Sequence, residues 1–376
     1  MNRFEFKTMS VDILGEMYER RVESALKWLK VSIDVNKGNG SSAYYINCRL
    51  PLGWTKAYPE TTGYLIETLY DYALSFPEMN LSDYAAKQAD WLVNIQLSSG
   101  AYMGGKVGSA SKPSIFNTGQ IIFGLIRAYL ETQSTKYLIS AENSCSWLLR
   151  NLEKDNSWLI GSYIEGYCPS YYTRVIWAIL YANTVIKSKE LEVAMRKALQ
   201  YYFGKVNDVY GVQDWSFKKD EKAFTHTIAY TIRGFYESSV LLEDDDLKVL
   251  VINMADKIVR LREVKGSLAG RYDERWNGDY SFLCLTGNCQ LSIILSKLFL
   301  ETQDVRYFNA SLKLFEDILP YQKMRGSNNI RGSIAGSSPV YGSYMFMRYP
   351  NWPAKFFLDA YLLLKTSKEK LMPQKV

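Results

Sequence analysis

One segment decides the fold, and it reads FNTGQIIFGLIRAYLE over residues 116–131. It is apolar on nearly every face, which is typical of a helix buried on both sides and not of an amphipathic surface helix. Similar segments recur along the chain, each starting at a threonine-containing turn, and a sixth starts at Asn351 without the threonine. With Thr62, Thr118, Thr173, Thr227, Thr286 and Asn351 as anchors, the intervals are 56, 55, 54, 59 and 65 residues. Six units at this period indicate a repeat architecture.

Amphipathic segments alternate with the buried ones, with charged residues on one helical face and Leu, Trp, Ile and Val on the other. They span residues 82–96, 137–152, 191–206, 247–261 and 307–319, and a sixth is expected over 11–33. The connection after a buried segment also recurs, because ETQSTKYL (131–138) and ETQDVRYF (301–308) share one pattern. We therefore predict an all-α fold, an (α/α)6 toroid of six inner and six outer helices that forms a single domain over residues 1–376.

The connections that lead back to each inner helix are long. They span residues 97–117, 155–172, 207–224, 263–285 and 324–350. Loops of this length inside a compact domain are usually functional. The repeat places all of them on one face of the ring, together with the N-termini of the inner helices, which favour anions and sugar oxygens. We expect the functional site at this mouth of the ring.

The composition is that of a globular protein. Hydrophobic residues make up 47% of the 376 residues and charged residues 22%, which excludes a disordered or fibrous chain. The net charge of +6 favours anionic partners. The 29 Tyr and 9 Trp exceed the needs of a core and suit stacking on sugar rings or bases. Basic residues are scattered through the repeats, which argues against a nucleic-acid partner.

Further sequence features concern location and cofactors. No apolar stretch is long enough to span a membrane, and the N-terminal residues lack the apolar core of a signal peptide. The five cysteines are odd in number and form no CxxC pair, so we expect a cytoplasmic protein. The single histidine, His226, excludes sites that need a histidine pair, and no phosphate-binding glycine motif precedes a helix. We expect no metal and no cofactor; the oligomeric state is not indicated.

The strongest candidate for chemistry is FTHTIAYTIR, residues 224–233. On a helix His226, Tyr230 and Arg233 form one stripe two turns long. These side chains can remove a proton from a carbon next to a carboxylate, with His or Tyr as base, the other as acid, and Arg to hold the acid group. The alternative is structural, with His226 hydrogen-bonded to a neighbouring helix end and the other two side chains closing the core.

A second candidate is GRYDERW, residues 270–276. Asp273 or Glu274 is a candidate general acid or base, and Arg271 or Arg275 is a candidate for binding an anionic substrate. Tyr272 is a further candidate for substrate contact. The alternative is a surface cluster of salt bridges, which contributes little to stability.

A third candidate is YPETTGY, residues 58–64. Glu60 lies just before an inner helix and either caps that helix or serves as a catalytic carboxylate. Paired with Asp273 across the mouth, it would form an acid–base pair for glycosidic cleavage. Tyr64 is a candidate for contact with a substrate.

Other inner helices also begin with polar or aromatic side chains. An interior helix does not need them, since a buried unpaired polar group costs about 1–3 kcal/mol. A polar, aromatic-lined cavity at the ring centre accounts for them. The candidate binding residues of this kind are Gln120, Arg174, Asn288, Trp352 and Lys355.

The six anchored helices, the ETQ connections and the WLxxxQxxxG segment from Trp91 to Gly100 together resemble the six-hairpin α/α-toroid superfamilies. These hold glycoside hydrolases, polysaccharide lyases, glucuronyl C5-epimerases and N-acylglucosamine epimerases. The resemblance spans nearly the whole chain and is one of architecture. Uronate lyases and C5-epimerases use Tyr, His, Asn and Arg, which His226, Tyr230, Asn288 and Arg233 match in type.

A weaker resemblance links residues 91–102 and 147–158 to the aromatic repeats of terpene cyclases and protein prenyltransferases. The chain lacks the DxDD acid motif of those cyclases. The zinc site of the transferases needs His and Cys ligands, for which this chain offers only one histidine and scattered cysteines.

We therefore expect a carbohydrate-active enzyme whose partner is an acidic poly- or oligosaccharide. The leading mechanism is metal-independent abstraction of the C5 proton of a uronic acid, as in an epimerase or a lyase. Three alternatives stay open: a glycoside hydrolase with a carboxylate pair, a non-catalytic glycan-binding protein, and a terpene cyclase-like protein.

Overall fold

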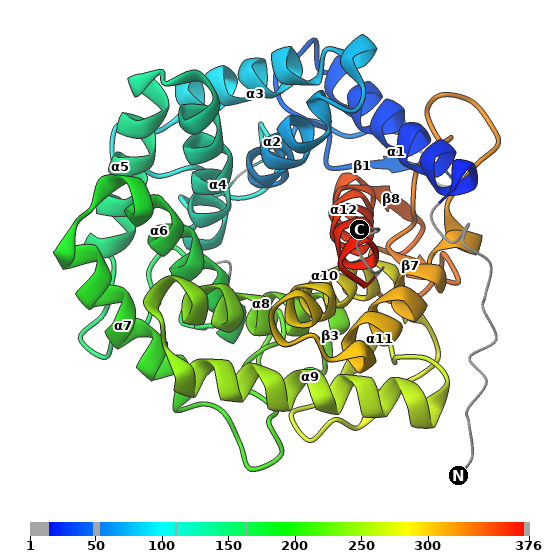
Figure 1. Cartoon of the computed structure of the whole chain (residues 1–376). Coiled ribbons are helices and arrows are strands. Elements are labelled where there is room, and N and C mark those ends of the chain that lie inside the picture. The colour runs from blue at the N-terminus through cyan, green and yellow to red at the C-terminus, as the bar shows by residue number, and fades with distance from the viewer. Residues whose placement is uncertain (1–14, 48–52, 110, 163, 372–376) are drawn as a thin grey trace, which may run out of the picture.

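The computed structural model describes residues 15–47, 53–109, 111–162 and 164–371, and in this part of the chain twelve α-helices form two concentric rings (Figure 1). The inner ring consists of α2 (Pro59–Ala73), α4 (Ile115–Thr132), α6 (Thr173–Ile186), α8 (Thr225–Leu242), α10 (Leu285–Thr302) and α12 (Asn351–Leu371). The outer ring consists of α1 (Glu16–Asp34), α3 (Leu81–Ile95), α5 (Thr135–Arg150), α7 (Lys189–Phe203), α9 (Asp245–Lys265) and α11 (Val305–Glu316). The predicted all-α toroid is confirmed.

The predicted elements differ from the observed ones mainly at their ends. The outer helix expected over 11–33 begins at Glu16 in the structure, and residues 11–14 lie outside the described part, as does Cys48. The other four cysteines are free and buried. No helix in the described residues is long and apolar enough to cross a membrane.

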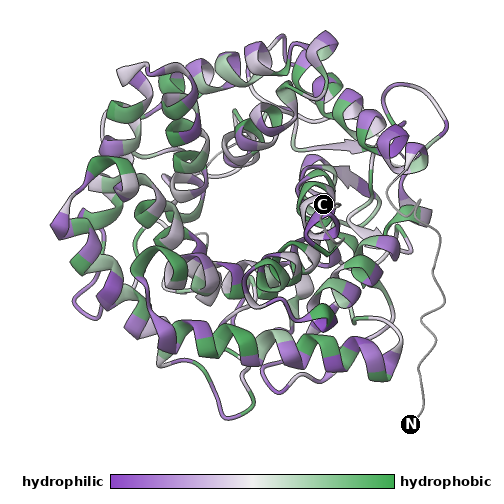
Figure 2. Cartoon of the chain, in the orientation of Figure 1, coloured by the Kyte–Doolittle hydropathy of each residue, from purple (hydrophilic) through white to green (hydrophobic). Residues whose placement is uncertain are grey.

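Burial follows the two helix types that the sequence indicated. In α4 every residue from Ile115 to Ile126 is buried, whereas in α5 the buried residues recur at helical spacing along one face. Figure 2 shows the hydrophilic residues of the outer ring gathered on its outward side. Glycines let two inner helices approach closely: a Cβ atom at Gly124 of α4 would collide with the carbonyl oxygen of Gly63 in α2. The inner ring is therefore packed on both sides.

The repeated ETQ connection is a helix terminator. Gln133 and Gln303 end α4 and α10 in the left-handed conformation, with φ of 58° and 60°. The preceding threonine accepts a hydrogen bond from the backbone N–H two residues later, in one copy from Asp304 to Thr302 over 3.2 Å. Asp304 in turn caps the N-terminus of α11. The motif therefore has a structural role in turning the chain from the inner to the outer ring.

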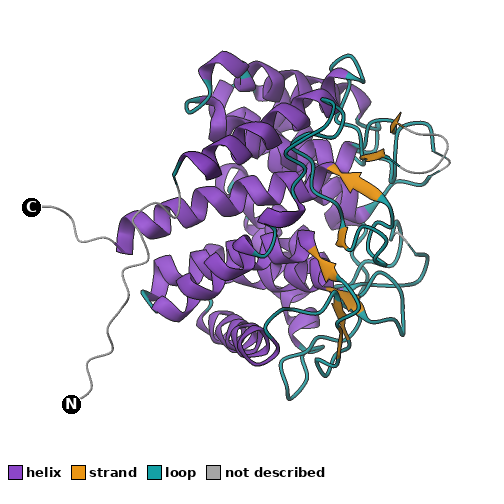
Figure 3. Cartoon of the chain, turned by 90° about the vertical axis from the view of Figure 1, so that its right-hand side faces the viewer, coloured by secondary structure: helices purple, strands orange, loops and turns teal. Residues whose placement is uncertain are grey.

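The long loops lie together on one face of the ring (Figure 3), and they contain short strands that the sequence analysis did not predict. Strands of two or three residues are too short to show an alternating pattern. One antiparallel sheet has the order β2 (Gly53–Trp54), β1 (Tyr44–Ile46) and β8 (Arg348–Pro350). A second has the order β3 (Ala223–Phe224), β4 (Arg271–Tyr272) and β5 (Gly278–Asp279), and β6 (Leu283–Cys284) pairs with β7 (Ser337–Ser338). Three short 3-10 helices are η1 (Pro77–Met79), η2 (Ser170–Tyr172) and η3 (Leu319–Tyr321).

The pairing of β1 with β8 joins the connection between α1 and α2 to the loop before α12 and helps to close the ring. On the helical side, α12 packs against both α1 and α2, so the last inner helix completes the circle. The six inner helices consequently begin at the same face, and their first turns converge around one axis.

Candidate active site

Two helices on opposite sides of the ring contribute the central titratable groups. Glu60 lies in the first turn of α2 and His226 in the first turn of α8. Helix α2 packs between α4 and α12, and α8 packs between α6 and α10, so the two side chains come from opposite walls (Figure 1). Both are buried, with 8% and 5% of their surface exposed.

His226 is held as a neutral imidazole. Its Nδ1 donates a hydrogen bond to Gln290 Oε1 over 2.7 Å, which leaves the Nε2 lone pair available. The pKa of His226 is lowered to about 3, mainly by burial; the hydrogen bond to Gln290 opposes this effect and the charge of Arg174 adds to it. At neutral pH the imidazole is therefore unprotonated and Nε2 can accept a proton, although a pKa of about 3 makes it a weak base.

Glu60 is a carboxyl group that is held partly protonated near neutral pH. Burial raises the pKa of this carboxyl group from 4.5 to about 7, although the Tyr58 hydroxyl, which donates a hydrogen bond to Oε2, and the charge of Arg174 both lower the pKa. Near neutral pH a substantial fraction of Glu60 is therefore protonated and able to donate a proton. The start of α2 thus supplies both groups: Glu60 in its first turn, and Tyr58, the residue before the helix, whose hydroxyl orients the carboxyl group.

Two tyrosines lie between these groups. The ring of Tyr230 lies 4.3 Å from that of His226, one helical turn along α8, as the predicted stripe requires. Tyr230 and Tyr64 of α2 share a side-chain hydrogen bond, so they connect the two walls of the ring. Burial raises the pKa of both phenols, which keeps them protonated.

Arg174 of α6 lies beside this pair and is completely buried. Its guanidinium carbon lies within 4.7 to 5.9 Å of the centroids of five aromatic rings, Tyr64, Phe123, Trp177, Tyr230 and Phe356. Its Nε donates to Gln120 Oε1 over 2.5 Å, while Nη1 has no partner among the described residues. None of the described carboxylates forms an ion pair with it.

Several buried polar atoms near the starts of the inner helices are unpaired. Four nitrogen atoms in the first two turns of α4, α6 and α10 have no hydrogen-bond partner in the described structure: Gln120 Nε2, Arg174 Nη1, Asn288 Nδ2 and Gln290 Nε2. All of them are donors, and each unpaired group costs about 1–3 kcal/mol. A ligand that brings several acceptor oxygens would satisfy them.

Sequence reasoning missed two residues of this cluster, Tyr58 and Tyr344. Tyr344 comes from the last long loop; its ring lies 5.2 Å from that of His226, and its hydroxyl accepts a hydrogen bond from Trp352 Nε1 over 2.8 Å. The only sequence signal for Tyr344 is an aromatic residue in a loop rich in Gly and Ser. Which aromatic of that loop faces inward depends on the loop's path.

Two predicted binding residues lie further along the ring axis. Arg233 Nε donates to Glu237 over 3.1 Å in α8, and Lys297 pairs with the same carboxylate over 3.0 Å. Lys355 forms an ion pair with Asp359 one turn later in α12. Each cation thus has a protein counter-ion, in contrast to Arg174.

The predicted loop residues lie in the β4–β5 hairpin. Arg271 pairs with Asp279 over 2.9 Å, and the Tyr272 hydroxyl accepts a hydrogen bond from the Ala269 N–H within its own loop. Asp273 closes a turn by accepting hydrogen bonds from Arg275 and Asn277. Although partial burial opposes them, these bonds lower the pKa of Asp273. No described hydrogen bond connects Asp273 with Glu60 or His226.

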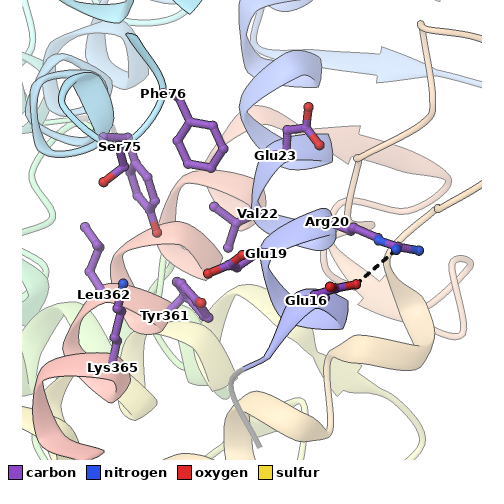
Figure 4. A pocket seen from close by; sticks show the side chains of 11 residues that line it. Glu16, Glu19, Arg20, Val22, Glu23, Ser75, Phe76, Tyr361, Leu362 and Lys365 are labelled. Carbon is purple, nitrogen blue, oxygen red and sulfur yellow. Dashed lines mark hydrogen bonds and ion pairs between the residues drawn. The ribbon is translucent and has the colours of Figure 1, made fainter. Parts of the chain in front are cut away.

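The side chains around Glu60 and His226 are buried at the loop end of the ring, and the cavity expected from the sequence stays a prediction. Tyr64, Tyr230 and Tyr344 occupy the space between the walls. Hollows are found elsewhere in the described structure. One of about 580 Å³ lies between α1 and the ends of α2 and α12, at the opposite end of these helices (Figure 4). Another of about 460 Å³ lies beside Trp215 among the loops.

No family model matches the chain, and no curated protein matches its sequence. Solved structures do match. An unsaturated glucuronyl hydrolase specific for heparin superposes with a TM-score of 0.75 at 14% identity, over 94% of this chain and 99% of that one. An unsaturated glucuronyl hydrolase from Bacillus sp. GL1 gives 0.71 at 14% identity, over 92% and 96%. Cellobiose 2-epimerase from Bacillus thermoamylovorans gives 0.69 at 13% identity, over 92% and 99%. The chain therefore has the α/α-toroid fold found among these carbohydrate-active enzymes.

Proposed function

We propose that the protein is a carbohydrate-active enzyme that abstracts the C5 proton of a uronic acid unit in an acidic oligo- or polysaccharide. The observation that carries the proposal is the convergence of a neutral base, a protonated acid and an unpaired buried cation at the loop end of the ring. The solved structures of the same fold support a saccharide, because they include an unsaturated glucuronyl hydrolase and a cellobiose 2-epimerase.

The opposite positions of the acid and the base fit this chemistry. In the proposed reaction His226 Nε2 accepts the C5 proton, and the electron pair of the C–H bond moves toward the substrate carboxyl group. In an epimerisation, Glu60 then returns a proton to C5 from the other face of the sugar. In an elimination, the C4–O bond breaks instead and Glu60 protonates the leaving oxygen. Epimerisation needs one group on each face of the sugar, and an anti elimination needs the same arrangement. Glu60 and His226 come from opposite walls of the ring, α2 and α8, which fits both reactions.

The substrate carboxylate has a matching cation. Burying an arginine without a carboxylate partner carries a large desolvation cost. The five aromatic neighbours of Arg174 offset only part of this cost, since a desolvated cation–π contact contributes about 1–2 kcal/mol. A uronate carboxylate would pair with Arg174 and stabilise the negative charge that develops on proton abstraction. The unpaired amide nitrogens of Gln120, Asn288 and Gln290 would donate to the same carboxylate or to sugar hydroxyl groups.

The test is incubation with uronate-containing oligosaccharides in heavy water. We expect deuterium at C5 of the recovered substrate or epimer, or a new C4–C5 double bond that absorbs in the ultraviolet. His226→Gln and Glu60→Gln should each reduce the rate by about 10²–10⁴-fold, the usual contribution of a general acid or base. Glu165→Gln, which neutralises an exposed loop carboxylate, is the control. New reducing ends without deuterium or double bond would refute the proposal.

A glycoside hydrolase is the second candidate, and the raised pKa of Glu60 favours it, since such enzymes need one protonated carboxyl group. The partner that the sequence suggested, Asp273, accepts the hydrogen bonds of its own turn.

A glycan-binding protein would be favoured instead if the wild type showed no turnover and if His226→Gln and Glu60→Gln both retained saccharide binding.

A further inference from the structure

Tyr344 lies over the candidate active site. Its ring is 5.2 Å from that of His226 and 5.1 Å from that of Phe224, and only 4% of the residue is exposed. Beneath it, Glu60 and His226 are too buried for a sugar ring to reach both. For a saccharide to contact the acid and the base, part of the cover must therefore move.

The segment that carries Tyr344 has the features of a movable cover. We call residues 339–347 the strap; it connects β7 to β8, and each of these strands is fixed by pairing to β6 or β1. Within the strap Met345 and Met347 have φ of 53° and 57°, a left-handed conformation that costs a non-glycine residue roughly 1 kcal/mol or more. Both ends are thus anchored, while the backbone between them is strained in the closed position.

The strap also holds Tyr344 through specific contacts. Trp352 Nε1 at the start of α12 donates to the Tyr344 hydroxyl over 2.8 Å, and Ser337 Oγ donates to the Tyr344 carbonyl oxygen over 2.6 Å. By contrast, Tyr341 of the same strap is 64% exposed and faces solvent. One aromatic of the strap is therefore bound into the site and another is not, which provides a matched pair for experiments.

We infer that Tyr344 is the specificity-determining residue of the site and that the strap, latched by Trp352, restricts it to the terminal unit of an acidic saccharide chain. A terminal unit has one glycosidic neighbour and fits beneath a strap that is anchored at both ends. An internal unit continues in two directions, and its chain would have to pass through the anchored strap. This inference rests on the proposed function for the identity of the ligand, but the covering role of Tyr344 does not.

The covering role can be tested without any substrate, because His226 is the only histidine in the chain. Diethyl pyrocarbonate modifies neutral histidine, and the absorbance of the product reports on His226 alone. We expect Tyr344→Ala to raise the modification rate at least about tenfold over wild type, since reaction then no longer waits for local opening. Tyr341→Ala should leave the rate unchanged. Equal rates in wild type and Tyr344→Ala would overturn the inference.

Two further variants keep the test decisive if Tyr344→Ala fails to fold. Tyr344→Phe and Trp352→Phe each remove the 2.8 Å hydrogen bond but keep an aromatic ring. Both should increase the rate of modification by a similar factor, smaller than that for Tyr344→Ala. An unchanged rate in both variants would show that Trp352 is not a latch.

The specificity is tested with uronate oligosaccharides labelled at the reducing end. The wild type should change only the terminal unit, and Tyr344→Ala should also change internal units. If the wild type changes internal units as readily as terminal ones, the inference fails while the proposed function stands. If the wild type changes no uronate at all, the proposed function fails, and the modification rates still decide whether Tyr344 covers His226.

Discussion

Glu60 and His226 are expected to make opposite contributions to the pH dependence of stability. Glu60 has a folded-state pKa near 7 against 4.5, so its folded form binds a proton that the unfolded chain has lost. Its contribution is fully present below pH 4.5 and is lost as pH rises through about 7. His226 has a folded-state pKa near 3 against 6.5, so its contribution is present above pH 6.5 and is lost as pH falls towards 3.

The two effects cancel between pH 4.5 and 6.5, where each changes the free energy of unfolding by about 1.4 kcal/mol per pH unit. Replacing one group should therefore expose the slope of the other. Over this range Glu60→Gln should lose about 2.7 kcal/mol of stability as pH falls, and His226→Gln should lose about 2.7 kcal/mol as pH rises. The difference between the two variants, in which all other groups cancel, should change by about 5 kcal/mol across two pH units.

The assay is urea-induced unfolding of both variants and the wild type at several pH values, followed by tryptophan fluorescence and evaluated by linear extrapolation. Thermal unfolding at the same pH values is the independent check. Parallel pH profiles for Glu60→Gln and His226→Gln would refute the reasoning, because they would mean that neither group changes its pKa on folding.

Three further predictions follow from the same structure. In a pH–rate profile, turnover of a uronate saccharide should stay constant over pH 5–6. Above pH 7 it should fall about tenfold per pH unit, because Glu60 loses the proton that it must donate. A rate that rises above pH 7 contradicts this role of Glu60. Arg174→Met should weaken the binding of acidic saccharides, as measured by calorimetry. Thermal stability should stay unchanged or rise, because the substitution removes an unpaired buried charge. A clear loss of stability would mean that Arg174 is a structural residue. Gly124→Ala should destabilise the protein by about 1–3 kcal/mol in urea, since its Cβ would force α4 away from α2. Gly204→Ala is the control, because Gly204 has a negative φ and its added Cβ would make only ordinary contacts of 3.5 Å.

Local sequence patterns predicted where the candidate site lies. They predicted only some of the residues that form it. A residue's place near the start of an inner helix is encoded nearby, so Glu60, Gln120, Arg174, His226 and Asn288 could be named as candidates from the helix starts. Their partners were harder to find, because a cation such as Arg233 carries no local sign that a carboxylate one turn away, Glu237, will pair with it.

By itself the sequence determined the ring, because a period of about 55 residues and the contrast between apolar and amphipathic helices are local properties that any closed packing must respect. It also determined the face on which the loops gather, since every long connection precedes an inner helix. Only the tertiary structure decided which groups meet at the axis. The cation–π cage of Arg174 draws on residues from five helices, and Tyr344 reaches His226 from a loop more than a hundred residues away. Such contacts depend on the path of the whole chain around the ring, which no local pattern records.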